Sequence, residues 1–155
     1  MMTPTHPRGF TLLIAVLVAG ILLSLGFAIF NIVSKDILLS SSGRESLSAF
    51  YAADSGVECA LYADKNNQFS TSSPQIPVCR GQIVADYSTE VNAGFHTTRF
   101  TLSLGAAPAA PCALVRVVRY DQPGEQKTTT IYSSGYNTCT LTNPRRTERA
   151  LRVDY

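Results

Sequence analysis

Residues 10–34, FTLLIAVLVAGILLSLGFAIFNIVS, form an uncharged run of 25 residues. As an α-helix this run reaches about 37 Å, which exceeds the ~30 Å hydrocarbon core of a bilayer. The nine residues ahead of it carry Arg8 and His6 and no acid. Positive charge before a span keeps the N-terminus in the cytoplasm. The sequence therefore predicts one membrane-spanning helix, with everything after Lys35 exported.

The remaining composition fits one small globular domain. The 155 residues are 45% hydrophobic and 15% charged, with a net charge of +2. A charged fraction below the usual level of about 25% excludes a disordered, highly charged chain. The small net charge lacks the concentrated basic face of a nucleic-acid-binding domain.

The junction before the apolar run has a distinctive pattern. Its sequence, Pro7-Arg8-Gly9-Phe10-Thr11-Leu12-Leu13, combines a short basic leader, Gly-Phe-Thr-Leu and an adjoining uncharged span. This pattern resembles the leader junction of type IV pilins and pseudopilins. In that family a prepilin peptidase cuts after the glycine, and the new N-terminal residue is methylated. The resemblance implies a leader of residues 1–9, cleavage between Gly9 and Phe10, and N-methylation of Phe10. The alternative is a plain signal anchor that contains Gly-Phe by chance.

One position departs from the family pattern. The usual fifth mature residue is Glu, thought to neutralise the N-terminal amine of a neighbouring subunit, but here it is Ile14. A carboxylate inside a membrane is costly and is kept only for a purpose. This chain cannot offer that partner, although its own Phe10 amine can use a neighbour's Glu. The loss resembles minor pilins and pseudopilins that sit at a filament tip, and it favours a minor subunit.

The apolar run continues into an amphipathic segment, residues 35–64. Leu47, Phe50 with Tyr51, Val57 and Leu61 recur there at helical spacing, and no proline occurs between residues 8 and 73. We expect one long helix over about residues 10–64. Its first half, from Phe10 past Val33, would lie in lipid or a filament core, and residues 35–64 would pack on a head domain. The small-residue stretch over residues 52–58 resembles one common in minor pilins.

A polar run is expected to end this helix. Asp64-Lys65-Asn66-Asn67 contains poor helix formers. Oxygen donors at Asp64, Asn66 and Asn67 could hold calcium, as in some pilin heads. Because no acidic ligand follows at the spacing of an EF-hand, we prefer the helix-ending role and predict no metal site.

Residues 65–155 predict an antiparallel β head. Runs rich in Val, Ile, Thr, Tyr and Phe occupy residues 82–88, 95–104, 113–120, 128–134 and 149–155. Chain reversals are expected at residues 121–125 and at Asn143-Pro144. The prediction is an α+β fold, in which the helix covers one face of a meander of four or five strands.

Four cysteines, Cys59, Cys79, Cys112 and Cys139, lie on the exported side, where disulfides persist. A head of about ninety residues is only marginally stabilised by its core, so bridges of ~2–4 kcal/mol each are valuable. Of the three possible pairings we favour the sequence neighbours, Cys59–Cys79 and Cys112–Cys139. A zinc site is disfavoured because no two cysteines have the close spacing of structural sites, and free buried thiols are the other alternative.

The sequence lacks the motifs of common enzymes. Beyond the leader the one histidine is His96, in a Thr-rich strand, where we expect an ordinary surface residue. No zinc-protease, nucleophile-elbow or phosphate-loop motif occurs. We therefore expect no enzymatic activity, no cofactor and no small-molecule substrate.

A basic run lies near the C-terminal end of the sequence, at Arg145, Arg146, Arg149 and Arg152. One interpretation is a contact with another subunit or with an anionic surface such as DNA. The other is a solvated strand face with cross-strand ion pairs, which we favour because one short basic strand rarely makes a nucleic-acid site.

These features predict a structural, minor subunit of a type IV pilus-like filament. Membrane lipid would hold the processed helix until an assembly platform, driven by a separate ATPase, moves it into a bundle with other pilin subunits. The protein would sit in the inner (cytoplasmic) membrane with its head exported, and then in an extracellular filament. A pseudopilin of a type II secretion or DNA-uptake system is the alternative within the family. A single-span membrane anchor displaying a non-polymerising binding head is the alternative of another class.

Overall fold

The computed structural model describes residues 8–69, 75–79, 81–92, 94–106, 109–121 and 126–155. The chain divides into two compact units, residues 1–42 and residues 43–155. Helix α1 (Arg8–Lys65) runs through the first unit and into the second. Of the expected leader, residues 1–7 lie outside the described residues, and Arg8 and Gly9 are the first residues of α1.

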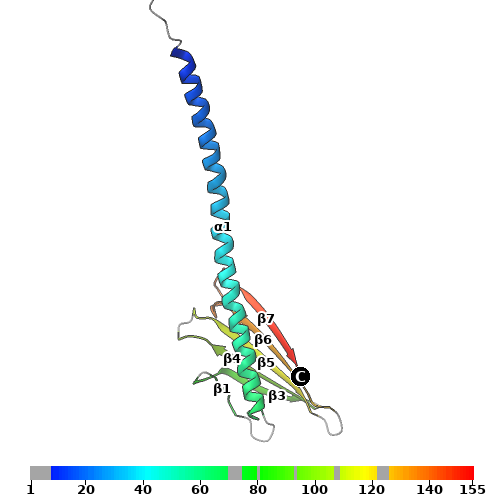
Figure 1. Ribbon diagram of the computed structural model, residues 1–155. Coiled ribbons are helices and arrows are strands. Elements are labelled where there is room, and N and C mark those ends of the chain that lie inside the picture. Colours follow the sequence, from blue (N-terminus) through cyan, green and yellow to red (C-terminus); the bar gives the residue numbers. More distant parts are fainter. Residues whose placement is uncertain (1–7, 70–74, 80, 93, 107–108, 122–125) are drawn as a thin grey trace, which may run out of the picture. The chain divides into compact units, whose positions relative to one another are not determined.

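The second unit is an α+β head. A five-stranded antiparallel sheet carries its strands in sequence order, and a two-stranded hairpin precedes it. The α1 residues of this unit lie across one face of the sheet (Figure 1). The predicted fold class and meander are therefore confirmed. The strands are β1 (Val78–Cys79), β2 (Gln82–Ile83), β3 (Ala85–Asn92), β4 (Phe95–Ser103), β5 (Cys112–Tyr120), β6 (Thr128–Tyr136) and β7 (Glu148–Asp154).

The first expected strand, residues 82–88, is in fact two strands. β2 pairs with β1, whereas β3 pairs with β4. Between them Val84 is buried and donates its backbone N–H to the Pro77 carbonyl at 3.3 Å. The pairing of β3 then shifts register between Ala85 and Ser88, around Asp86 with φ 51°, which is the geometry of a bulge. The change of pairing partner at Val84 is non-local, so local strand propensity does not show it.

The other expected strands agree with the structure to within two residues. Of the expected loop at residues 121–125, only Asp121 is among the described residues. The reversal at Asn143 is present: its carbonyl accepts the backbone N–H of Arg146 at 3.1 Å and its side chain accepts that of Arg145 at 2.9 Å.

Small side chains on α1 form the contact with the sheet. The helix residues Ala49, Ala52, Ala53, Ala60 and Ala63 are all 0% exposed. On the sheet side, a Cβ atom at Gly135 of β6 would collide with the backbone of Ala49 and Ala53. Helix and sheet therefore approach as closely as backbones can, which explains why glycine stands at the crossing point.

The sequence interpretation of the packed helix face is wrong, except at Val57. Leu47, Phe50, Tyr51 and Leu61 are 53%, 43%, 58% and 37% exposed, whereas Val57 is 6% exposed. The physical reason is the close approach of α1 to the sheet, which leaves room for alanine and glycine but not for large side chains. The small residues of α1, mainly its buried alanines, form the packed face, and the large apolar residues other than Val57 point away from the core.

Both disulfides form with the predicted pairing. Cys59 of α1 joins Cys79 of β1, and Cys112 of β5 joins Cys139 in the segment after β6, with Cα–Cα distances of 5.7 and 5.6 Å. The first bridge attaches the hairpin to the helix, and the second attaches the segment after β6 to the start of β5. They close spans of 20 and 27 residues.

Candidate membrane and assembly segment

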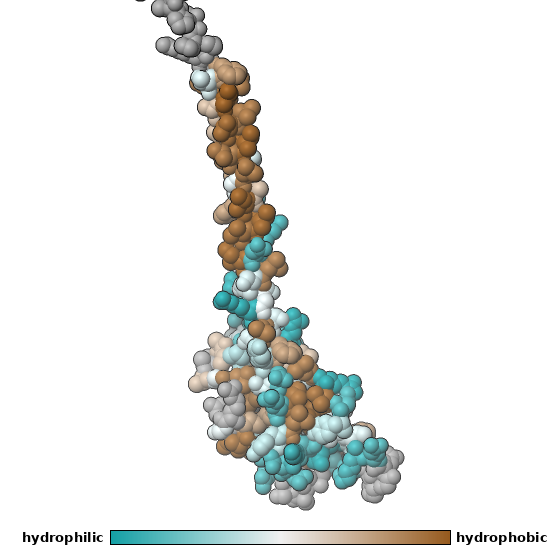
Figure 2. Space-filling view, viewed as in Figure 1, coloured by the Kyte–Doolittle hydropathy of each residue, from teal (hydrophilic) through white to brown (hydrophobic). Residues whose placement is uncertain are grey.

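The first unit presents an exposed apolar helix surface. Phe10, Leu12 and Leu13 are 64%, 69% and 60% exposed, and Ile14 and Val33 are 45% and 49% exposed. Apolar side chains cover this part of α1 in Figure 2. Among the described residues α1 is the one helix long and apolar enough to cross a membrane, with a mean hydropathy of 2.8 in its most apolar window and none of that window buried. Its surface needs lipid or other apolar helices around it.

The hydroxyl groups of two serines in this segment bond to the helix itself. The hydroxyl of Ser24 donates to the Ile21 carbonyl at 2.8 Å, and that of Ser34 donates to the Phe30 carbonyl at 2.8 Å. Such internal bonds are what a helix requires in hydrocarbon, where no water is present to accept them. The segment is therefore compatible with a single-pass membrane anchor.

The Gly9–Phe10 bond lies in the first turn of α1, since the helix begins at Arg8 rather than at Phe10 as expected. Backbone N–H groups of a first turn have no partner within the helix. Glycine also weakens a helix by roughly 1 kcal/mol relative to alanine. The bond thus lies at an end of α1 where the helix opens more easily than in its interior.

Small residues leave open space along the apolar helix. A Cβ atom at Gly20 or Gly26 would meet nothing within 4 Å. Leu23, Phe27 and Phe30 border an open apolar notch at Gly26. A notch of this kind lets a second helix approach closely.

In the head, the outward face of α1 carries a row of large residues, which we call the α1 outer stripe. Its aromatic members include Phe50 and Tyr51, whose ring centroids are 6.1 Å apart in an edge-on arrangement. Asp54 and Glu58 are exposed on the same side of the helix. The stripe consists of Leu47, Phe50, Tyr51, Leu61 and Tyr62, which are all exposed.

The C-terminal end of α1 is held by Asp64. Its carboxylate lies 3.2 Å from Nε of Arg119 on β5 and accepts the hydroxyl of Tyr155 at 2.8 Å. Burial, followed by this contact with the Asp64 carboxylate, raises the pKa of Tyr155 to about 12. Arg119 also donates to the Phe69 carbonyl at 3.1 Å. Asp64 therefore has a structural role: it connects the end of α1 to β5 through Arg119 and to Tyr155, the residue after β7.

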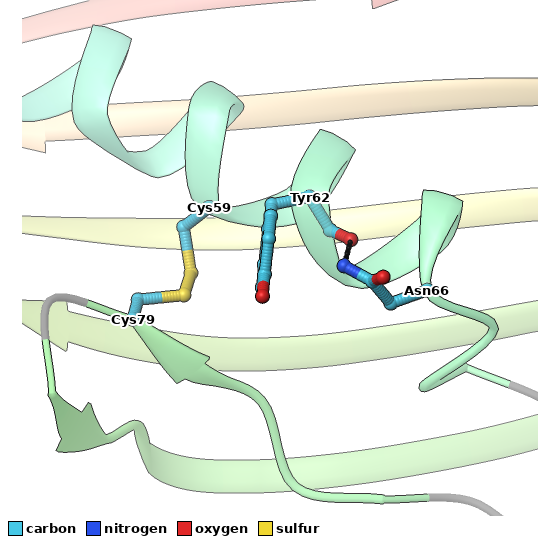
Figure 3. The surroundings of a disulfide bond; sticks show 4 residues. All are labelled: Cys59, Tyr62, Asn66 and Cys79. Atoms are coloured by element: carbon cyan, nitrogen blue, oxygen red, sulfur yellow. Dashed lines mark hydrogen bonds between the residues drawn. A yellow bond between two sulfur atoms is a disulfide. The ribbon is translucent and has the colours of Figure 1, made fainter.

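The asparagines after Asp64 close the helix, as expected. The side chain of Asn66 donates to the Tyr62 carbonyl at 2.8 Å (Figure 3). Asn67 takes φ 56°, a left-handed conformation that asparagine tolerates at helix ends. Figure 3 also shows the Tyr62 side chain beside the Cys59–Cys79 bridge, so the outer stripe ends against this disulfide.

The basic run is divided among different surfaces. Arg149 donates to the Ser46 hydroxyl of α1 at 2.8 Å, and Arg146 stacks over the Tyr136 ring at 3.6 Å. Arg152, on the opposite face of β7, pairs with Asp154 at 3.0 Å. In the described part of the chain, this pair within β7 stands in place of the expected cross-strand ion pairs of the basic run. The period of two also puts Arg149 and Arg152 on opposite faces of β7. Arg145 is exposed.

His96 is half-buried rather than on the surface. It lies on β4 on the same face as Thr98 and Phe100, which are both 2% exposed. Its Nδ1 atom is buried without a hydrogen-bond partner among the described residues. The histidine expected on the surface is therefore only partly exposed, because it lies on the same face of β4 as the buried Thr98 and Phe100.

No group of three or more His, Cys, Asp or Glu side chains within the described ranges is arranged to hold a metal ion. Comparison with known proteins found no matching family model, no similar curated protein and no similar solved structure. The architecture, a long apolar N-terminal helix on an antiparallel sheet, is pilin-like. The more specific likeness rests on the residues from Pro7 to Leu13.

Proposed function

We propose that this chain is a structural, minor subunit of a type IV pilus-like filament, processed by a prepilin peptidase after Gly9. The observation that carries the proposal is the uncovered apolar surface of α1, which starts directly after Arg8-Gly9 and belongs to the same helix that packs on the head. In the membrane, lipid covers this surface. In a filament, the helices of neighbouring subunits replace the lipid.

Two features support helix-to-helix assembly over simple anchoring. The open notch at Gly26 would let a neighbouring apolar helix approach closely. The α1 outer stripe gives the head a second apolar surface, next to the acidic side chains of Asp54 and Glu58. A lone anchor needs the first surface for lipid but has no use for the second.

Ile14 assigns this subunit a one-sided role in assembly. Residues 10–34 contain no carboxylate. The charged Phe10 amine would therefore depend on a Glu from a neighbouring subunit, while this chain returns none. Such a subunit cannot form a uniform shaft with matched charges, which favours a minor place, such as the tip. Recovery of this chain as the bulk component of purified filaments would overturn that assignment.

The test is the intact mass and N-terminal residue of the full chain, extracted from membranes without reductant. We expect a start at methylated Phe10, with the mass lowered by four hydrogens for two disulfides. A parallel culture without prepilin peptidase should give the uncut chain, and Gly9→Val should block cleavage where the peptidase is present. An uncut Met1 start in the presence of active peptidase would instead favour the single-span anchor.

A second experiment separates filament subunit from processed anchor. Gly26→Leu fills the notch and should lower recovery of the chain in sheared filaments, with processing unchanged. Leu25→Ile, a volume-conserving change on the same exposed helix, is the matched control. Equal recovery of both variants and the wild type would remove the notch from the assembly surface.

A further inference from the structure

A row of arginines crosses the sheet on the face away from α1. Arg99 on β4 is the direct partner of Arg116 on β5, Arg116 of Tyr132 on β6, and Tyr132 of Arg152 on β7. Arg116 alternates with Val115 and Val117, which are 2% and 1% exposed on the helix-facing side. The row therefore lies on the outer face of the sheet.

This row lines a broad open groove of about 670 Å³. Leu114 and Ser134 also border it, so the groove offers apolar surface and hydroxyl groups beside the guanidinium groups. Of the basic run, Arg152 lines the groove at one end, whereas Arg145, Arg146 and Arg149 are not among its lining residues. The site depends on strand register, which brings residues 99, 116, 132 and 152 together.

The charges in the row are unequally compensated. Arg99 pairs with Glu90 at 3.0 Å and Arg152 with Asp154 at 3.0 Å, all four side chains being about half exposed. Arg116 forms an ion pair with no carboxylate of the described residues. Its guanidinium lies 4.3 Å from the centre of the Tyr132 ring, which Arg152 also approaches, at 5.4 Å.

The guanidinium groups of Arg99 and Arg116 are turned to opposite sides, although the two residues are direct partners. Arg99 pairs with Glu90 of β3, whereas Arg116 stacks on Tyr132 of β6. Arg116 is therefore the arginine of the row that is left for an anion. A planar carboxylate suits it, because guanidinium forks bind carboxylates with two parallel hydrogen bonds.

The flanking acids argue against an extended polyanion. Asp86 lines the same groove, and Glu90 and Asp154 pair with the arginines of the row. A nucleic acid would bring successive phosphates close to these carboxylates, whereas its affinity depends on several uncompensated cations. One uncompensated arginine accommodates one or two negative charges.

We propose that the outer-face groove binds an acidic, extended peptide segment of a partner protein, with a carboxylate side chain placed against Arg116. Three strand spacings separate β4 from β7, or about 14 Å, which four extended residues span. The hydroxyl of Ser134 can form a hydrogen bond with the peptide backbone. Leu114 can pack against an apolar side chain of the peptide next to the acidic residue. This partner site lies on the opposite sheet face from α1, and it holds for a filament subunit or an anchor alike.

The test measures fluorescence anisotropy of a labelled peptide, Ser-Glu-Leu-Glu-Ser, with the full chain in detergent micelles. We expect saturable binding, weakened about tenfold or more when both Glu are replaced by Gln. Arg116→Gln should weaken binding of the acidic peptide by a similar factor. The matched control, Arg145→Gln, removes an equal charge from an exposed position outside the groove and should leave binding unchanged.

Three results would overturn the proposal. One is the absence of saturable binding by the wild-type chain, and another is equal weakening by Arg116→Gln and Arg145→Gln. The third is complete displacement of the peptide by a single-stranded dodecathymidylate at lower concentration than by unlabelled peptide, which would assign the groove to nucleic acid. Near-ultraviolet circular dichroism of Arg116→Gln should match the wild type. If it does not, Arg116→Lys, which keeps the charge but lacks the planar fork, must weaken binding with an unchanged spectrum, or the proposal fails.

Discussion

The two halves of α1 use small residues in opposite ways. In the head, Ala49, Ala53 and Ala60 are fully buried against the sheet. In the first unit, Gly20 and Gly26 face open space, and the apolar side chains around them are exposed. One helix thus carries a small-residue face that is buried against the sheet and another whose small residues are exposed. Residue size, more than hydrophobicity, decides where each half packs closely.

The largest effect is expected from a glycine-to-alanine substitution in the head, and the same substitution in the first unit is its comparison. Gly135→Ala places a methyl group into the backbone of Ala49 and Ala53, which cannot move aside as a side chain can. We expect a loss of about 4 kcal/mol in the unfolding free energy of the head. Urea unfolding of the full chain in detergent, followed by near-ultraviolet circular dichroism, measures it.

Gly26→Ala is the matched control in the other half of the helix. Its new Cβ atom meets nothing within 4 Å, so the unfolding of the head should be unchanged. Gly56→Ala should lie between the two, because its Cβ atom would meet the side chains of Ser133, Ala113 and Val115, which can shift partly. Equal stability of Gly135→Ala and wild type would contradict the close approach of helix and sheet.

The next largest effect concerns the disulfides. All four cysteines follow residue 42, so both bridges belong to the head. Replacing Cys112 and Cys139 together by Ser should lower the stability of the head by about 3 kcal/mol, since the bridge closes a 27-residue span. The Cys59 and Cys79 double replacement, over 20 residues, should cost nearly as much. Denaturant midpoints measure both losses. A stability that does not respond to reduction would show that the core alone holds the head.

Local sequence patterns were enough to predict much of this molecule. The uncharged run, the alternation along β4 to β7 and the polar residues after Asp64 each reflect a local physical rule, and the structure confirms them. The pairing of cysteines followed from their order in the chain. These features depend on neighbours in sequence, so composition and period are sufficient evidence.

The failures all depend on non-local contacts. Strand propensity cannot show that β2 pairs with β1 while β3 pairs with β4, because pairing depends on the partner strand as well as on a strand's own residues. The rule that large apolar residues face the core failed on α1, although the spacing of Ala49, Ala53 and Ala60 was visible in the sequence. The row from Arg99 to Arg152 requires the register of four strands, which no local pattern contains.

A smaller effect concerns the end of the helix within the head. Burial and the Asp64 carboxylate raise the pKa of Tyr155 to about 12, above the ordinary value of 10.0. The folded state therefore favours the protonated phenol. This contribution to stability is complete below about pH 10 and is lost as the pH rises toward 12. Because the side chain is 53% exposed, we expect only about 1 kcal/mol.

Tyr155→Phe isolates this contribution. The variant should be about 1 kcal/mol less stable than the wild type at pH 8, through loss of the hydrogen bond to Asp64. The difference should shrink toward pH 12, when the wild-type phenol ionises beside a carboxylate. Unfolding midpoints of both proteins over this pH range provide the comparison. A constant difference at all pH values would mean that the raised pKa does not contribute to folding.

The smallest expected effect bears most directly on what the outward face of α1 is for. Tyr51 is large and 58% exposed, and serine has a similar helix propensity, so Tyr51→Ser should change the stability of the head by no more than about 0.5 kcal/mol. If the stripe packed on the sheet, as its periodicity alone suggests, the loss would instead be about 3 kcal/mol or more. The same variant should nevertheless reduce recovery of the chain in sheared filaments, because an aromatic side chain left exposed in the free subunit gains its burial only on association. Unchanged stability with reduced assembly would separate the two faces of α1 in one substitution, whereas unchanged assembly would leave only the apolar half, from Phe10 to Val33, as the contact between subunits.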